Sequence, residues 1–331
     1  MPSRPFVEQK GSMMKIFRFV AIPAIIGLMI LSLAPAWGQK SIYSYTGTNQ
    51  SYVIPANVTS ISVKLWGAGG ACAGGSGAFI SGLLSVTPGE TLTLIVGGGN
   101  GVSYRLGERS YGGGGSWRGV SDVLAGGGGG CSVILLGNTQ LAVVGAGGAG
   151  TYATNTGNFS LGGGGGILTG GTSGNGVTGG TQTSGGTSFD PYGVTGGSLS
   201  GGDALGRGAG GGSGYYGGGG GSQIGEKGLF GGGGGSSLIA NLTGLIAEPG
   251  QLGSTGGVLP GGFGDIDYQL GIGVGGTGGI GSDGGNGGNG RIVITALAPV
   301  VVPEPGSLTL LLPIFGIAVS GYQKRRARSI K

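Results

Sequence analysis

Glycine is the residue that most restricts how this chain can fold. It supplies 92 of the 331 residues, and all but six of these glycines lie between Gln39 and Val300. In that stretch one residue in three lacks a side chain, whereas the usual share of glycine is about 7 %. The glycines follow no strict three-residue period and prolines are few, which excludes a collagen triple helix. Because ordering glycine costs conformational entropy, the tracts either stay mobile or adopt an arrangement that only glycine permits.

One arrangement specific to glycine is a bundle of extended chains with three residues per turn. Such chains have no internal hydrogen bonds, and without Cβ atoms they can approach closely enough to bond one another. Between Thr151 and Ser200 the glycines are scattered among Ser and Thr, so the sequence leaves open whether this segment is flexible. Elsewhere the chain contains uninterrupted runs suited to the bundle: Gly112–Gly115, Gly126–Gly130, Gly162–Gly166, Gly217–Gly221 and Gly231–Gly235.

Short stretches between the glycine tracts have the pattern of half-buried β-strands. Ile61, Val63 and Leu65 alternate with more polar residues, and this period of two is typical of a strand with one buried face. The same reasoning predicts further strands over residues 91–96, 131–136, 140–144 and 291–295, with a Pro-Gly turn at 87–90.

Charge and histidine content argue against two broad function classes. The net charge of +5 comes from the two ends, because residues 39–300 carry eight Lys or Arg and ten Asp or Glu. That balance gives no electrostatic reason to bind nucleic acid. The chain has no histidine, so it lacks the commonest general base and transition-metal ligand. We therefore expect no enzyme activity and no cofactor.

Residues 1–38 have the pattern of a secretory signal peptide. Lys15 and Arg18 precede an apolar run over residues 20–33, and small residues follow. We expect cleavage after Gly38, which keeps proline out of the cleavage site. The alternative is an uncleaved membrane helix.

The C-terminal 31 residues, 301–331, form a tripartite segment. Pro303, Glu304 and Pro305 precede an apolar stretch, and five residues rich in Lys and Arg follow at 324–328. A helix over residues 308–322 spans about 22 Å, which is shorter than a hydrocarbon core of about 30 Å. We therefore expect a marginal, transient inner-membrane anchor with the basic tail in the cytoplasm.

This order of motif, helix and basic tail resembles the PEP-CTERM sorting signal, whose matching residues here are Pro303, Glu304 and Pro305. The resemblance implies a Gram-negative bacterial protein that passes through the secretion machinery. It also implies that a membrane protease-transpeptidase, exosortase, removes the helix and tail, leaving the product at the cell surface or in the extracellular matrix. The alternative is a plain C-terminal membrane anchor.

The body, residues 39–300, is similar to bacterial glycine-rich secreted proteins and to the glycine-rich region of anaplastic lymphoma kinase. The matching anchors are the segments 63–70, 87–92 and 289–294. The resemblance implies an all-β fold, a jelly-roll-like β-sandwich with inserted polyglycine II-like helices. Hydrophobic targeting helices at the two termini complete the expected architecture.

Two cysteines, Cys72 and Cys131, are the only ones in the chain. Oxidising export favours a disulfide between them, and the alternative is two separate buried thiols.

Three weaker candidate sites involve aspartates and aromatic residues. Residues 261–267 approach the calcium-binding nonapeptide pattern, with Asp283 and Asn286 nearby in sequence, although solvated loop acids are the simpler interpretation. Asp265 and Asp267 are also the carboxylate pair that an exported hydrolase would need. Among the aromatic residues, Tyr215 and Tyr216 are expected to anchor glycine segments, and the alternative is that they stack on sugars or on another chain. Three further residues are candidates for surface sugar contacts: Tyr104, Tyr111 and Trp117.

We therefore expect an exported structural or interaction protein that associates with extracellular polysaccharide or with its own copies. A carbohydrate-binding surface module is the alternative, and an exported hydrolase is a third, weaker hypothesis.

Overall fold

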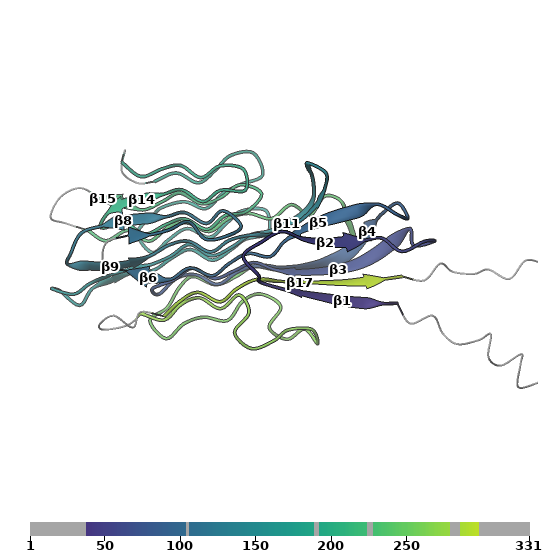
Figure 1. Ribbon diagram of the computed structural model, residues 1–331. Helices are drawn as coiled ribbons and strands as arrows, with labels where there is room; N and C mark the ends of the chain where they lie inside the picture. The colour runs from purple at the N-terminus through teal and green to yellow at the C-terminus, as the bar shows by residue number, and fades with distance from the viewer. Residues whose placement is uncertain (1–37, 104–105, 189–191, 224–227, 279–284, 298–331) are drawn as a thin grey trace, which may run out of the picture. The chain divides into compact units, whose positions relative to one another are not determined.

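The computed structural model describes residues 38–103, 106–188, 192–223, 228–278 and 285–297 (Figure 1). Within these ranges the protein is all-β and forms seventeen strands and no helix. The expected signal peptide and C-terminal anchor lie outside the described residues.

Two antiparallel sheets lie face to face as a β-sandwich. Sheet A has the order β1 (Lys40–Ser44), β17 (Arg291–Ala296), β3 (Ser60–Trp66), β4 (Phe79–Ser85) and β16 (Leu242–Glu248). Sheet B has the order β11 (Thr139–Val144), β10 (Ser132–Leu136), β5 (Thr91–Ile95) and β2 (Gln50–Val53). The first and last described strands, β1 and β17, are therefore neighbours in one sheet.

Strand β3 shows how the sandwich closes. Ile61, Val63 and Leu65 are fully buried, whereas Ser62 and Lys64 lie half-buried on the opposite face. Burying one face of each sheet supplies the apolar area that drives folding. The core between the sheets also contains residues from the neighbouring strands: Ile80, Leu84, Leu92, Leu94, Ile134, Ala142, Val144, Ile292 and Ile294.

The strands and turns predicted from the sequence are confirmed, with small differences at their ends. Residues 291–295 lie in β17, and the predicted hairpin forms from β10 and β11. Gly137 has a φ of +56° at the hairpin turn, and Gly89 has a φ of +82° in the turn at 87–90. Both turns thus use glycine where a side chain would strain the backbone.

Two smaller sheets lie among the glycine-rich segments. One has the order β13 (Phe159–Ser160), β12 (Thr151–Ala153), β9 (Val123–Gly126) and β6 (Val102–Ser103). The other has the order β15 (Ser222–Gln223), β14 (Ala204–Gly206), β8 (Trp117–Gly119) and β7 (Leu106–Gly107). In the second sheet β14 runs parallel to both β8 and β15.

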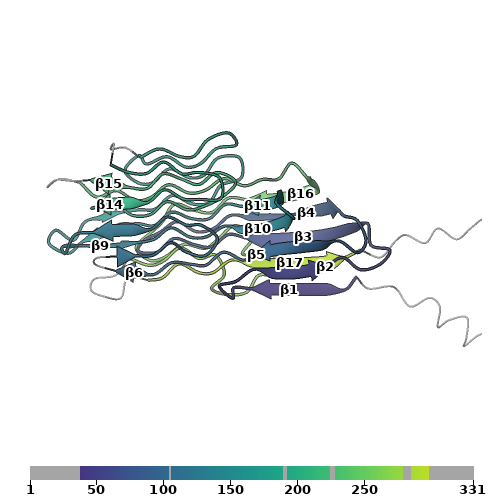
Figure 2. The same ribbon diagram turned by 45° about the horizontal axis from the view of Figure 1, so that its top comes forward.

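The glycine-rich segments run side by side and bond through their backbones (Figures 1 and 2). We call this array the glycine lattice; its main segments are 67–77, 112–115, 126–130, 145–150, 162–166, 208–221 and 231–236. In the central segment, Gly147, Gly148 and Ala149 donate their N–H groups across N···O distances of 3.0, 2.8 and 2.9 Å. The three acceptors belong to three different segments: the carbonyls of Ala68, Gly163 and Gly210. A sheet strand has two bonded neighbours, so this segment is bonded on more sides than a strand.

The lattice spacing excludes side chains. A Cβ added to Gly147 would overlap the backbone of Gly75, and one added to Gly163 would overlap Gly171; both approaches are under the 3.0 Å that real Cβ atoms essentially never reach. These backbone groups are buried, and each has the hydrogen-bond partner that a buried polar group needs. Glycine is therefore a steric necessity at these positions.

Much of the segment 151–200 belongs to the same array. Gly163 donates to Gly232 at 2.9 Å, and Gly186 donates to Gly217 at 2.9 Å. The described residues of this segment thus have defined backbone partners, although the sequence left their order open.

We predict that Gly147→Ala destabilises the full chain by about 3 kcal/mol or more, because its Cβ would force neighbouring backbones apart. The matched control is Gly256→Ala, since a Cβ at Gly256 meets nothing within 4 Å. The control should change the free energy of unfolding by less than about 1 kcal/mol. Denaturant unfolding of both variants measures the difference, and equal effects would contradict the steric role of the lattice.

Candidate functional site

One long connection, residues 249–278, which we call the strap, covers part of the outer face of sheet A. It follows β16 and lies beside β17 and β1, where Figure 1 draws it in green to yellow. The rings of Trp66 and Phe79 lie in contact on that outer face, tilted by 35° with their centroids 4.6 Å apart. Tyr268 and Ile272 of the strap pack against this pair. The strap thereby buries the surface of two aromatic rings that face away from the sandwich core.

Ion pairs join the strap to the sheet. Lys64 Nζ lies 2.8 Å from Asp265 Oδ1 and 2.9 Å from Asp267 Oδ2. Lys40 forms a second ion pair with Asp267. The Asp267 N–H also donates to Asp265 Oδ1 at 2.8 Å, which orients the carboxylates toward the lysines. Two acids and two bases thus form one nearly neutral cluster.

This cluster corrects two of the interpretations of the aspartates drawn from the sequence: a calcium site and solvated loop acids. A calcium site needs several uncommitted oxygen ligands, but both carboxylates are occupied by ammonium groups. They are also not the solvated loop acids of the alternative. Among the described residues no group of three or more His, Cys, Asp or Glu could hold a metal ion. Asn286 is exposed, and Asp283 lies outside the described residues.

Sequence reasoning missed the lysine partners. Lys64 sits between Val63 and Leu65, so strand periodicity already places it on the face away from the core. An outward lysine on a strand whose outer face is covered needs an acidic partner. That requirement, together with the Asp-x-Asp sequence at residues 265–267, could have predicted the ion pairs of Lys64.

The charges in the cluster lower the pKa of Asp267 and raise that of Lys64. For Asp267, burial alone would raise the pKa, but hydrogen bonds and charges from Lys40 and Lys64 bring it below its ordinary 3.8. For Lys64, burial alone would lower the pKa, but the two aspartates raise it above its ordinary 10.5. Both shifts favour the charged forms of Asp267 and Lys64 near neutral pH.

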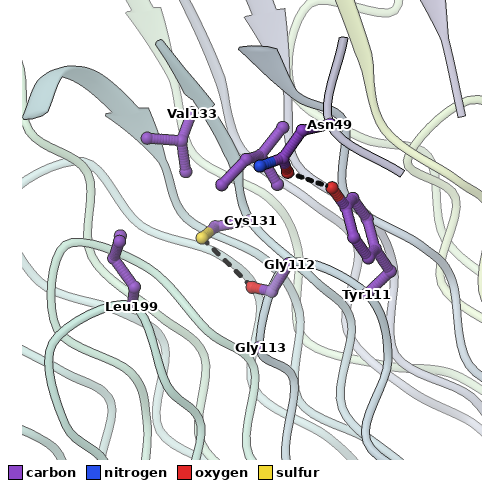
Figure 3. Close-up of a pocket in the computed structure, with 8 residues that line it drawn as sticks. Asn49, Tyr111, Gly112, Gly113, Cys131, Val133 and Leu199 are labelled. Atoms are coloured by element: carbon purple, nitrogen blue, oxygen red, sulfur yellow. Dashed lines mark hydrogen bonds between the residues drawn. The ribbon is translucent and has the colours of Figure 1, made fainter. Parts of the chain in front are cut away.

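A small hollow lies on the outer face of sheet B (Figure 3). Its volume is about 240 Å³, and no charged residue lines it. The Tyr111 hydroxyl donates to Asn49 Oδ1 at the hollow, and Cys131 Sγ donates to the Gly112 carbonyl at 3.2 Å. The remaining lining residues are apolar or glycine: Ile95, Gly113, Val133 and Leu199. Such a lining offers apolar contact surface but no charged group for binding or catalysis.

The two cysteines are free thiols in the structure, so the expected disulfide is not formed and the alternative of two separate buried thiols applies. Cys72 packs with Leu124 and Tyr152, whereas Cys131 packs with Val133 and Val143 in another cluster. Burial raises the pKa of Cys72 to about 12 and that of Cys131 to about 11. Neither thiol has the character of a nucleophile.

The aromatic candidates are also reassigned. Trp117 is fully buried in a lattice cluster and is therefore not a surface sugar contact. Tyr111 forms the bond to Asn49 described above, and Tyr104 lies outside the described residues. Tyr215 and Tyr216 lie edge to face, 5.2 Å apart, and Tyr215 packs against the cluster that contains Cys131.

The predicted sorting motif, Pro303, Glu304 and Pro305, lies outside the described residues, as does the segment 308–322. Gly38, the predicted cleavage position, is the first described residue. In the part of the chain that the structure covers, we find no apolar helix long enough to cross a bilayer. No protein-family model matches this chain, and no curated protein is significantly similar to it.

We predict that native protein at pH 8 resists the thiol reagent DTNB, because both cysteines are buried and their pKa values lie well above 8. Unfolding in guanidinium without a reductant should then release both thiols. Fewer than two reactive thiols after unfolding would show that a disulfide forms.

A second prediction concerns pH. The pKa of Asp267 is lowered on folding, so its contribution to stability is present above the unfolded value of about 3.9 and is lost as the pH falls through the folded one. Lys64→Met should therefore lower the unfolding free energy by about 1 kcal/mol near pH 7 and by progressively less below pH 4. Lys40→Met is the matched control with a smaller effect, because Lys40 is more exposed. Unfolding curves across pH 3–8 test this, and a pH-independent difference would contradict it.

Proposed function

We propose that this chain is an exported, non-enzymatic structural or interaction protein of a bacterial cell surface or extracellular matrix. The glycine lattice carries the proposal, because its buried interior consists mainly of backbone groups that bond one another, and its one thiol, Cys72, is buried with a raised pKa. Such an interior supplies stiffness and chemical inertness. The partners that fit are extracellular polysaccharide or further copies of the chain.

The lattice segments fit the geometry of polyglycine II-like helices. Chains of this kind point N–H and C=O groups in several directions around their axis, and the segment 145–150 bonds to three different neighbours with three successive N–H groups. The accompanying β-sandwich is consistent with a jelly-roll-like scaffold. These assignments agree with the resemblance to bacterial glycine-rich secreted proteins.

The alternative functions receive less support from the described side chains. A hydrolase needs one carboxyl group that holds a proton near neutral pH, but Asp267 has a lowered pKa and both aspartates pair with lysines. For a sugar-binding surface, the sequence named Tyr104, Tyr111 and Trp117; Trp117 is buried, and the Tyr111 hydroxyl is bonded to Asn49. No described feature favours either alternative over a scaffold.

The termini supply the route to the exterior in this proposal. Secretion machinery would export the body after cleavage at Gly38. The C-terminal segment would hold it briefly in the inner membrane until exosortase acts at Pro303, Glu304 and Pro305. Both predicted end segments then agree on one topology, with the body outside and the basic tail inside.

The test is to express the full chain in a Gram-negative bacterium that has an exosortase gene and in a strain lacking that gene. We expect the exported product to begin at Gln39 and to lack residues 308–331, whereas the deletion strain should retain them in its inner membrane. Intact-mass measurement distinguishes the two products.

Glu304→Ala should block this processing, and Glu90→Ala, outside the motif, should leave it unchanged. Identical masses in both strains would contradict sorting by exosortase. Recovery of the uncleaved chain from the cytoplasm would contradict export.

A further inference from the structure

The strap presents several large apolar side chains to solvent. Ile266 is 92 % exposed and Leu270 is 87 % exposed, and they are the two most exposed large apolar side chains among the described residues. Phe263, three residues before Ile266, is 52 % exposed. Scattered exposed apolar residues are ordinary, but three within eight residues require an explanation.

These side chains are held outward by the fold. Successive turns shape the segment, because Asp265 N–H donates to the Gly262 carbonyl at 3.1 Å and Tyr268 N–H donates to the Asp265 carbonyl at 3.0 Å. Asp265 and Asp267 are bound to lysines of sheet A, and Ile266 lies between them with its side chain in solvent. The ion pairs on either side therefore fix the direction in which Ile266 projects.

The remaining contacts strengthen this support. Glu248 accepts a hydrogen bond from Gly262 N–H at 2.8 Å, and Arg291 donates to Gln269 Oε1 at 2.5 Å. The tip therefore has one anchor before the three exposed residues and three further anchors between them. A segment with this many polar ties does not expose large apolar side chains through looseness.

The shape and charge of the tip fit a bilayer surface. The exposed residues project singly from turns and lie outside the hollow of sheet B, so they match a fluid apolar phase better than the fixed contours of a protein partner. The ions beneath them, Lys40 and Lys64 with Asp265 and Asp267, sum to zero formal charge. Nothing in this cluster selects a charged partner.

The path of the chain indicates which bilayer the tip can contact. Thr295 of β17 pairs with Lys40 of β1, and Lys40 bonds Asp267, the residue after Ile266. The described chain continues only one residue beyond β17, and the apolar run begins at Leu308, twelve residues beyond Ala296. Twelve extended residues span at most about 40 Å. The tip therefore lies within reach of any membrane that holds the C-terminal run.

We propose that Phe263, Ile266 and Leu270 form a membrane-docking tip, which enters the interfacial layer of the phospholipid bilayer that holds residues 308–322. This inference rests on the membrane anchoring in the proposed function. Its role is to orient the tethered body, so that the strap faces the bilayer and the far side of the lattice faces outward.

The test uses the full chain reconstituted in phosphatidylethanolamine–phosphatidylglycerol nanodiscs. Ile266→Cys is labelled with an environment-sensitive fluorophore, and the buried native thiols remain unlabelled. The matched control is Val194→Cys, because the native Val194 side chain is 45 % exposed. This position lies several lattice segments from the strap. The Val194 carbonyl accepts a hydrogen bond from Gly220 N–H, whereas the strap bonds to segment 67–77. We expect a blue-shifted spectrum at position 266, with several-fold stronger quenching by brominated acyl chains than at position 194.

Each other outcome contradicts the proposal in a distinguishable way. A disc-bound chain whose label at 266 is as solvated as that at 194 overturns docking but not anchoring. A blue shift at 266 that acyl-chain quenchers do not affect identifies a protein contact, such as a second copy, and overturns docking. Failure of the chain to co-purify with the discs overturns anchoring and docking together.

Discussion

Direct contact between backbones, at a distance that leaves no room for a Cβ atom, is the constraint on which this structure depends. An added Cβ on Gly67 would overlap Gly145, and one on Gly145 would overlap Gly235, so contacts of this kind link successive segments. The interior of this part of the protein is therefore held by amide hydrogen bonds, which are directional. Apolar side-chain packing, which is not directional, holds only the sandwich and a few small clusters.

The sandwich and the lattice are continuous along the chain, and this continuity sets the lattice register. Strand β3 ends at Trp66, opposite Phe79, and the ladder continues as Gly67 donates to the Ala78 carbonyl at 3.0 Å. The apolar core therefore aligns the strands, and the strands deliver the glycine segments in register. Bringing such flexible segments together costs much entropy, and the sandwich offsets part of that cost.

The strap adds electrostatics to a protein that otherwise contains few charges. Its two aspartates meet Lys40 and Lys64 over the outer face of sheet A, while Ile266 between them faces solvent. The same segment thus covers part of one face of the sandwich and presents an apolar tip. In the function proposed above, the lattice is a stiff body and the strap orients that body at a membrane.

Local sequence determined the parts of the fold that depend on neighbouring residues. The alternation around Val63 specified a half-buried strand, and the glycine of residues 87–90 specified a turn. The glycine runs indicated that backbones could pack without side chains. Partners far apart in the chain were beyond such reasoning: Cys72 and Cys131 are in separate clusters, Trp117 is buried, and Asp265 meets Lys64 across about 200 residues. Only the tertiary structure decided these contacts. Periodicity places a side chain on one face of a strand, whereas the register of distant segments decides which residue lies opposite that side chain.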